Sequence, residues 1–274
     1  MYTLRRVEQV FQPALFVLQV TVLGKGPEGK LYGRQWMNTV LFDLDGTLLP
    51  MEQEAFNHQY FTRLGKKFQP LGFEPKAFIE AMWQGIYAMF RNDGKITNEQ
   101  RFWPALSAAL GRDARVLEPI FEDFYANEFL EIKDVVTHPN PLSAACVKTL
   151  KDKGYELVLA SNPIFSFSGA SARMGWAGVD PKDFARITLY DNSSYCKPDV
   201  RYFSEILEKM GKTPGECLMV GNNVREDMCA ARLGIHTFLV TDYLMNPDQE
   251  NLAVYPKGSL QDLFEYLDAL PKSM

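Results

Sequence analysis

Two aspartates stand at the end of an apolar run. In "NTVLFDLDGTLL", residues 38–49, Asp43 and Asp45 are one residue apart and are followed at once by a glycine and a threonine. Neighbouring carboxylates repel each other unless a cation lies between them. Hard oxygen ligands at this density suit Mg²⁺, which usually keeps several waters beside a substrate phosphate. The pair therefore predicts a magnesium site that includes Asp43 and Asp45.

Other polar residues follow apolar runs elsewhere in the chain. They are Ser161 and Asn162 in "YELVLASN", Lys197 in "YCKPD", and Asn222 and Asp227 in "GNNVRED". If the runs are neighbouring parallel strands, their carboxyl ends meet at one edge of the sheet, where ligands bind. A lysine there would offset the charge of a phosphate, and a serine hydroxyl would donate to a phosphate oxygen.

Strand-like and helix-like segments alternate from residue 38 onward. The predicted strands are "TVLFD", "YELVLAS", "ARITLY", "ECLMVGN" and "IHTFLVT", which are short and almost wholly apolar. Helical stretches lie between them, as in residues 140–154, where Asn140 can cap the first turn and Gly154 can end the helix. A second helix is predicted over residues 198–211 and a last one in "GSLQDLFEYLDAL". The alternation predicts an α/β fold with a doubly wound parallel sheet, a Rossmann-like core.

One long segment after the two aspartates breaks this alternation. It contains four amphipathic helical patterns, "EAFNHQYFTRLG", "PKAFIEAMWQGIYAMF", "TNEQRFWPALSAALG" and "ARVLEPIFEDFYANEFL". Thr97 and Gln100 form a possible capping box at the start of the third. An all-helical cap inserted here would stand over the carboxyl ends of the strands, and therefore over the predicted site.

These segments give a division of the chain into domains. The catalytic core is predicted to comprise residues 37–52 and 134–274, and the helical cap residues 53–133. Residues 1–36 have little helix or strand pattern, and we interpret them as an N-terminal extension that precedes a domain beginning at Met37.

Composition narrows the classes of protein. With 274 residues, 46% of them hydrophobic and 23% charged, the chain can bury a sizeable core and is not mainly disordered. A net charge of −5 argues against nucleic acid as a partner. No run approaches the roughly 20 apolar residues of a membrane span. The four cysteines form no C-x-x-C pair, so neither disulfides nor a zinc site are expected, and the predicted localisation is cytoplasmic.

Taken in order, the four stretches resemble the motifs of the haloacid dehalogenase superfamily, and most closely its phosphatases with a helical cap inserted after the first strand. "DLDGT" is similar to the first motif, Ser161 in "LASN" to the second, Lys197 in "CKPD" to the third, and "GNNVRED" to the fourth. The resemblance extends over nearly everything from Met37 to the C-terminus.

The resemblance implies a role for each of these residues. Asp43 would attack phosphorus and form an aspartyl-phosphate. Asp45 would protonate the leaving oxygen, activate water afterwards and bind Mg²⁺ through its backbone carbonyl. Ser161, Asn162 and Lys197 would hold the transferring phosphate. Dehalogenases of the superfamily typically lack the second acid, so Asp45 favours phosphoester chemistry.

The fourth motif departs from the usual phosphatase pattern "GDxxxxD". Asn222 occupies the position of the first acid, whereas Asp227 matches the second. An amide oxygen can ligate Mg²⁺ but carries no charge, so we expect weaker metal affinity with Asn222 and Asp227 than with two acids.

The expected function is Mg²⁺-dependent hydrolysis of a small phosphorylated metabolite. A sugar-phosphate mutase shares these motifs, and a non-catalytic module that binds a phosphate ligand through a weakened metal site is the alternative from another class. In the cap, Met82, Trp83, Tyr87, Met89 and Phe90 are expected to form the cap's own core. Three cap cations, Arg91, Lys95 and Arg101, are expected to be solvated rather than to face the substrate.

Overall fold

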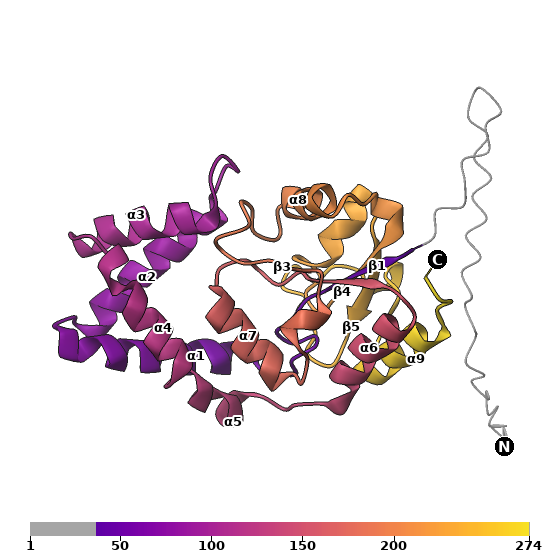
Figure 1. Ribbon diagram of the computed structural model, residues 1–274, viewed down its shortest axis with the longest axis horizontal. Helices are drawn as coiled ribbons and strands as arrows, with labels where there is room; N and C mark the ends of the chain where they lie inside the picture. Colours follow the sequence, from indigo (N-terminus) through magenta and orange to yellow (C-terminus); the bar gives the residue numbers. More distant parts are fainter. Residues whose placement is uncertain (1–36, 274) are drawn as a thin grey trace, which may run out of the picture. The chain divides into compact units, whose positions relative to one another are not determined.

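Six parallel strands form a single sheet in the described part of the chain (Figure 1). The computed structural model describes residues 37–273, so the predicted extension, residues 1–36, lies outside the described residues. The strands are β1 (Thr39–Phe42), β2 (Glu156–Leu159), β3 (Arg186–Ile187), β4 (Cys217–Gly221), β5 (His236–Val240) and β6 (Lys257–Gly258).

The strand order is β3-β2-β1-β4-β5-β6, and every pairing is parallel. The chain reverses its direction of winding between β1 and β4, so the carboxyl end of β1 lies at the switch point where ligands bind in such sheets. The predicted doubly wound α/β fold is confirmed, as are its five strands. The sixth strand was missed because its two residues, Lys257 and Gly258, form no apolar run.

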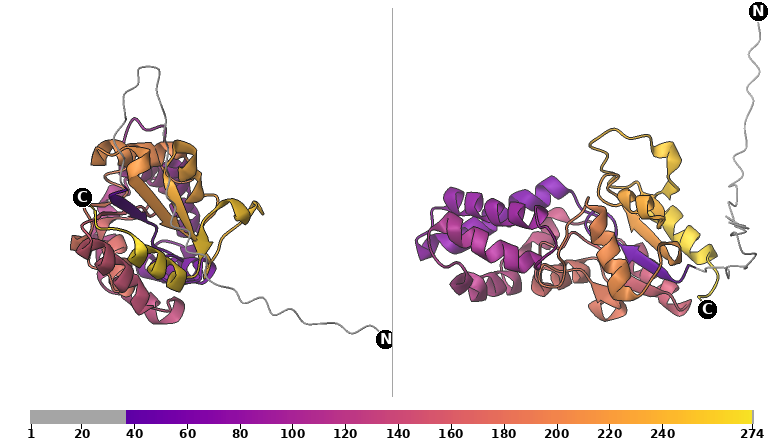
Figure 2. Two further views of the ribbon diagram at one scale, coloured as in Figure 1. Left: turned by 90° about the vertical axis from the view of Figure 1, so that its right-hand side faces the viewer. Right: turned by 90° about the horizontal axis from the view of Figure 1, so that it is seen from above.

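Helices cover both faces of the sheet. Val40 and Phe42 of β1 belong to an apolar cluster with α6 (Pro141–Asp152) and α9 (Leu260–Ala269), whereas Leu41 belongs to a second cluster with α8 (Val200–Met210). Successive side chains of a strand point to opposite faces, so a run of apolar residues is buried on both. Figure 1 and the end-on view in Figure 2 show α8 on one side of the strands and α6 and α9 on the other.

The segment between β1 and α6 is helical in the described structure, as predicted (Figure 2). Its main helices are α1 (Gln53–Phe68), α2 (Pro75–Phe90), α3 (Asn98–Leu110) and α4 (Glu118–Ala126). The capping box of Thr97 and Gln100 is present at the start of α3. The fourth predicted helix is interrupted: a 3₁₀ turn, Arg115–Leu117, precedes α4, and another, Leu130–Ile132, follows it before the short α5 (Lys133–Val136).

Two local expectations need correction. Helix α7 (Phe167–Trp176) was not predicted, because its small residues give a weak apolar stripe. The helix predicted from residue 198 begins at Val200, because the Asp199 side chain accepts from the Arg201 N–H there, and Lys197 lies three residues before α8. Lys197 is therefore held in a loop.

Within the described residues, the cysteines form no disulfide and no helix is suited to span a membrane. Cys146, Cys196, Cys217 and Cys229 are buried and free, and burial raises the pKa of each. Within residues 37–273, no helix combines the length and the apolar character needed to cross a bilayer.

Candidate active site

The end of β1 turns sharply after Asp43. Gly46 has a φ of +81°, and a Cβ atom there would lie 2.2 Å from Nδ2 of Asn222, so both the backbone and the space require glycine. The Thr47 hydroxyl lies 3.1 Å from Asp43 Oδ2 and 3.2 Å from Asn222 Oδ1, and it can donate to either. The turn thereby brings the end of β1 against the end of β4.

Lys197 lies under the nucleophile candidate as a buried cation. Its Nζ donates to Asp43 Oδ1 at 2.9 Å and to Asp227 Oδ1 at 2.6 Å, and the residue is only 1% exposed. Burial by itself would lower the pKa of Lys197, but the Asp227 and Asp43 carboxylates together raise that pKa well above its ordinary value. Lys197 therefore stays protonated and partly neutralises two acids.

Asp227 is fully buried against the end of β4. Its Oδ2 accepts from the backbone N–H of Asn223 at 2.9 Å, and a Cβ on Gly221 would lie 2.1 Å from the same oxygen. Burial raises the pKa of Asp227, and the Lys197 ammonium opposes that rise. A side chain at position 221 would displace this carboxylate, so the glycine that ends β4 is required for it to approach the site.

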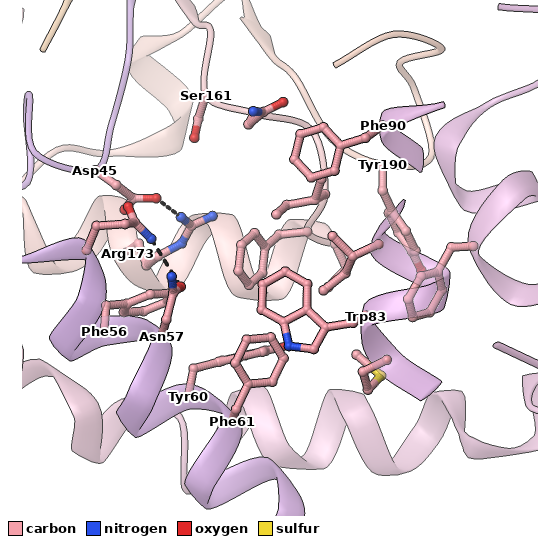
Figure 3. A pocket seen from close by; sticks show the side chains of 18 of the residues that line it. Asp45, Phe56, Asn57, Tyr60, Phe61, Trp83, Phe90, Ser161, Arg173 and Tyr190 are labelled. Atoms are coloured by element: carbon pink, nitrogen blue, oxygen red, sulfur yellow. Dashed lines mark hydrogen bonds and ion pairs between the residues drawn. The ribbon is translucent and has the colours of Figure 1, made fainter. Parts of the chain in front are cut away.

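The loop after β2 contributes a hydroxyl and an amide. The backbone carbonyl of Ser161 accepts from the Tyr202 hydroxyl at 2.9 Å, which fixes the loop, and Figure 3 shows the Ser161 side chain beside Asp45. Asn162 Oδ1 accepts from the backbone N–H of Lys197 at 3.1 Å, while its Nδ2 donates to Glu226 Oε2 at 3.0 Å. Asn162 thus links three of the four predicted motif regions.

The reading of the sequence missed an arginine in this site. Arg173 of α7 forms an ion pair with Asp45, 128 residues away in the chain, and is 2% exposed (Figure 3). Its Nε donates to the Gly169 carbonyl at 3.1 Å, and its guanidinium lies 4.0 Å from the centroid of the Phe165 ring. The available signal was an arginine among the small and apolar residues of "FSGASARMGW", where a charge needs a buried partner.

Arg173 and burial act in opposite directions on Asp45. Burial raises the pKa of Asp45, and the Arg173 charge lowers it, with a net rise above the ordinary value. Oδ2 faces the guanidinium, while Oδ1 is buried without a hydrogen-bond partner among the described residues. Asp45 therefore has one oxygen held in place and one available to exchange a proton.

A cavity of about 300 Å³ opens between these residues and helices α1–α4. All but one of the predicted site residues line it: Asp43, Asp45, Ser161, Asn162, Asn222 and Asp227. The exception, Lys197, lies behind Asp43 and Asp227. The structure therefore brings together residues from the ends of β1, β2 and β4, as expected of a doubly wound sheet.

Only part of the apolar stripe on α2 is buried in the core of the cap. Met82 and Met89 are buried as expected, but Tyr87 and Phe90 are 48% and 42% exposed. Met82, Trp83 and Phe90 line the cavity. The prediction was wrong for Tyr87 and Phe90, because the helical stripe is wider than the surface that the other cap helices cover.

The ligand atoms at this edge of the sheet are oxygens of the types that Mg²⁺ prefers. Asp43 and Asp227 supply carboxylates and Asn222 an amide oxygen, and the Thr47 hydroxyl within 3.2 Å of both Asp43 and Asn222 shows how close these two groups lie. Among the described residues, no three side chains of His, Cys, Asp or Glu are grouped as a metal cage. Two carboxylates with an amide and open positions match an ion that retains water and binds substrate phosphate.

Comparison with known proteins identifies the family. The family model for haloacid dehalogenase-like hydrolases matches residues 37–234. The glyceraldehyde 3-phosphate phosphatase of Methanothermobacter thermautotrophicus is 26% identical over 221 residues, which cover 79% of this chain and 91% of that protein. The mouse acyl-CoA dehydrogenase family member 10 is 26% identical over 252 residues, 85% of this chain, but this chain spans only 21% of its length.

Solved structures show the same fold. A HAD phosphatase from Thermococcus onnurineus has a TM-score of 0.54 at 20% identity, covering 86% of this chain and all of that one. The L-2-haloacid dehalogenase of Xanthobacter autotrophicus has a TM-score of 0.51 at 17% identity, covering 85% and 99%. The chain belongs to the haloacid dehalogenase-like hydrolases.

Proposed function

We propose that the protein hydrolyses a small phosphate monoester through an aspartyl-phosphate formed on Asp43, with Mg²⁺ as cofactor. The observation that carries the proposal is the buried Lys197, which contacts both Asp43 and Asp227 behind a cavity large enough for a small ester. A cation in this position offsets the charge that accumulates when an anionic nucleophile approaches an anionic phosphoryl group.

The proposed nucleophile is the Asp43 carboxylate. Its Oδ1 is held by Lys197, and its Oδ2 is near the Thr47 hydroxyl, so the side chain cannot rotate freely away from the cavity. Attack on phosphorus forms an acyl phosphate and expels the alcohol. The Ser161 hydroxyl lies on the same wall and would donate to a phosphoryl oxygen. Asn162, whose side chain binds Glu226 and the Lys197 backbone, would help to hold the phosphate by fixing the loop that surrounds it.

Asp45 would donate the proton that the departing alcohol needs. Its raised pKa keeps a larger protonated fraction than an exposed aspartate has, and Oδ1 is free of any described partner. After the alcohol leaves, the same carboxylate would take a proton from the water that attacks the aspartyl-phosphate. Arg173, through Oδ2, would position Asp45 for both steps.

Asp43, Asp227, Asn222 and the backbone carbonyl of Asp45 would hold the magnesium ion. When bound, the ion supplies charge neutralisation and orientation of the phosphate. Asn222 makes this set one charge less negative than an aspartate at position 222 would, so we expect activation at millimolar rather than micromolar Mg²⁺.

The test is release of inorganic phosphate from p-nitrophenyl phosphate with and without Mg²⁺. We expect turnover that a chelator abolishes, and a loss of at least about 10⁴-fold in Asp43→Asn, since a covalent nucleophile has no substitute. Turnover by Asp43→Asn at the wild-type rate would overturn the assignment of Asp43.

Two further measurements address the alternatives. A mutase would convert a sugar phosphate into its isomer without net phosphate release. A binding module would retain a thermal shift with inorganic phosphate but show no turnover of any ester. Phosphate release that ceases in Asp43→Asn excludes both.

A further inference from the structure

The cavity has two unlike ends. Figure 3 shows Asp45, Ser161 and Arg173 at one end and Trp83, Phe90 and Tyr190 at the other. A phosphate bound at the first end directs its alcohol toward the second. The chemistry of that far end therefore selects the leaving group.

Aromatic rings form most of the far end. Phe61 and Trp83 pack with their ring centroids 4.8 Å apart, and Phe102 contacts Trp103 edge-on with centroids 5.1 Å apart. The Tyr60 and Tyr125 hydroxyls lie 3.1 Å from each other and form a hydrogen bond. Both residues also line the cavity. Burial raises the pKa of Tyr60 to about 12, which keeps the phenol neutral.

Positive charge is scarce along this cavity. Among the described residues that line it, Arg173 is the one cation, and Asp45 already pairs with it. The acids on the cap wall, Glu118 and Glu122, add negative charge; Glu118 pairs with Arg115, and Glu122 accepts from two serine hydroxyls. A second anionic group on the substrate would be desolvated here without a partner, at high cost.

Several hydrogen-bonding side chains on the helical side of the cavity are already paired, including the Tyr60 and Tyr125 hydroxyls with each other and the Glu122 carboxylate with two serines. Gln53 and Asn57 of α1 line the cavity, but Gln53 Nε2 donates to Asn57 Oδ1 at 3.2 Å. A polyol would leave several hydroxyls without partners, each costing about 1–3 kcal/mol. An apolar body instead gains from every square ångström that it removes from water.

We propose that the preferred substrates are monoesters of neutral, apolar alcohols, whose alkyl or aryl body fills the aromatic end of this cavity. The inference rests on the proposed phosphatase function and adds the class of leaving group to it. It also excludes substrates with a second anionic group.

The test compares kcat/KM for phosphate release among esters of primary alcohols, which keeps the leaving oxygen similar. Hexyl and benzyl phosphate are the apolar probes, and sn-glycerol 3-phosphate, phosphoglycolate and phosphocholine are the polar ones. We expect an increase of about three- to fourfold per methylene from ethyl to hexyl phosphate, the value of burying a methylene group. Phosphoglycolate is expected to be the poorest substrate.

The possible outcomes separate the two proposals. A lack of phosphate release from any ester, or equal release by Asp43→Asn, overturns the proposed function itself. Release in which glycerol 3-phosphate or phosphoglycolate equals hexyl phosphate overturns only the apolar leaving group. A preference for phosphocholine would also overturn it, because aromatic rings with acids can bind a quaternary ammonium.

Two variants test the cavity wall directly. Trp83→Gln should lower kcat/KM for hexyl phosphate about tenfold while leaving methyl phosphate, which does not reach the wall, within about twofold. Phe90→Gln should act in the same direction, and this 42% exposed position carries little risk to folding. The matched control is Leu71→Gln, which is 46% exposed in the cap and lies outside the cavity; it should leave kcat/KM for both substrates unchanged. Equal losses for methyl and hexyl phosphate in both wall variants would overturn the inference.

Discussion

The two walls of the cavity are built on opposite principles. The wall at the sheet edge carries buried charges in contact with one another: Lys197 with Asp43 and Asp227, and Arg173 with Asp45. The wall formed by helices α1–α4 is mainly aromatic, and its charged groups make their contacts away from the reaction centre. Reaction chemistry depends on charges fixed at strand ends, whereas the choice of leaving group depends on which faces of four helices turn toward the cavity.

Removing the cation from the charged wall should have the largest effect. Lys197→Met leaves Asp43 and Asp227 buried together without a partner, which should cost about 3–5 kcal/mol in the free energy of unfolding. Loss of the positive charge behind Asp43 should lower kcat roughly 10²–10³-fold. Urea titration and phosphate release measure the two effects.

The double variant Lys197→Met/Asp227→Asn sharpens this prediction. It removes one of the two unpaired carboxylates as well, so part of the unfolding free energy should return while activity stays low. If the single and double variants were equally unstable, the charge pairing would not be the source of the loss.

Arg173→Gln should have a smaller and more selective effect. Without the guanidinium, Asp45 loses its positioning partner, so kcat/KM for alkyl phosphates should fall roughly tenfold. The effect on p-nitrophenyl phosphate should be weaker, because that leaving group scarcely needs a proton. If the role of Arg173 were purely structural, Arg173→Gln would lower kcat/KM equally for alkyl phosphates and p-nitrophenyl phosphate.

The pH profile gives an independent readout of Arg173. The Arg173 charge lowers the pKa of Asp45, so its removal raises that pKa further above the ordinary value. Formation of the aspartyl-phosphate needs protonated Asp45, and kcat/KM declines as pH rises through this pKa. Arg173→Gln should therefore move the alkaline limb to higher pH, whereas Arg173→Lys should leave it near the wild-type position.

Asn222→Asp should change metal dependence by a moderate factor. A third acid beside Asp43 and Asp227 should lower the Mg²⁺ concentration for half-maximal activity about five- to tenfold, because ligand charge sets affinity. In a chelator the melting temperature should fall, since the Asn222 Nδ2 bond to the Tyr243 carbonyl is lost. The control is Asn223→Asp, which adds the same charge at the adjacent residue and should leave the Mg²⁺ dependence unchanged.

Gly85→Ala should perturb the aromatic wall alone and give the smallest effect on turnover. A Cβ atom at position 85 would lie 2.7 Å from the Phe102 ring, so Phe102 must move within the cavity. We expect a loss of about 1–3 kcal/mol in unfolding free energy from overpacking and a raised KM for bulky esters, with kcat for methyl phosphate unchanged. Gly175→Ala in α7, where no atom lies within 4 Å, is the matched control and should not destabilise.

Much of the charged wall could be predicted because strand periodicity is a local property. Apolar runs ending in Asp43, Ser161 and Asn222 each predict a parallel strand, and parallel strands place their carboxyl ends at one edge. Even the departure at Asn222 was visible. The capping box at Thr97 was predicted for the same reason, since it depends on residues three positions apart.

Helical periodicity did not predict which residues form the aromatic wall. Trp83, Tyr87 and Phe90 share one helical stripe, yet two of them line the cavity and Tyr87 does not. Which part of an apolar stripe is covered depends on how neighbouring helices cross, and periodicity does not determine crossing.

The sequence by itself therefore determined the sheet, the inserted helices and the acids, amide, hydroxyl and lysine of the candidate site. Only the tertiary structure decided that Arg173 pairs with Asp45 across 128 residues and that Trp83 and Phe90 of the cap line the cavity. The physical reason is range: strand and helix signals act between neighbours in the chain, whereas an ion pair or a cavity wall exists only once distant surfaces meet.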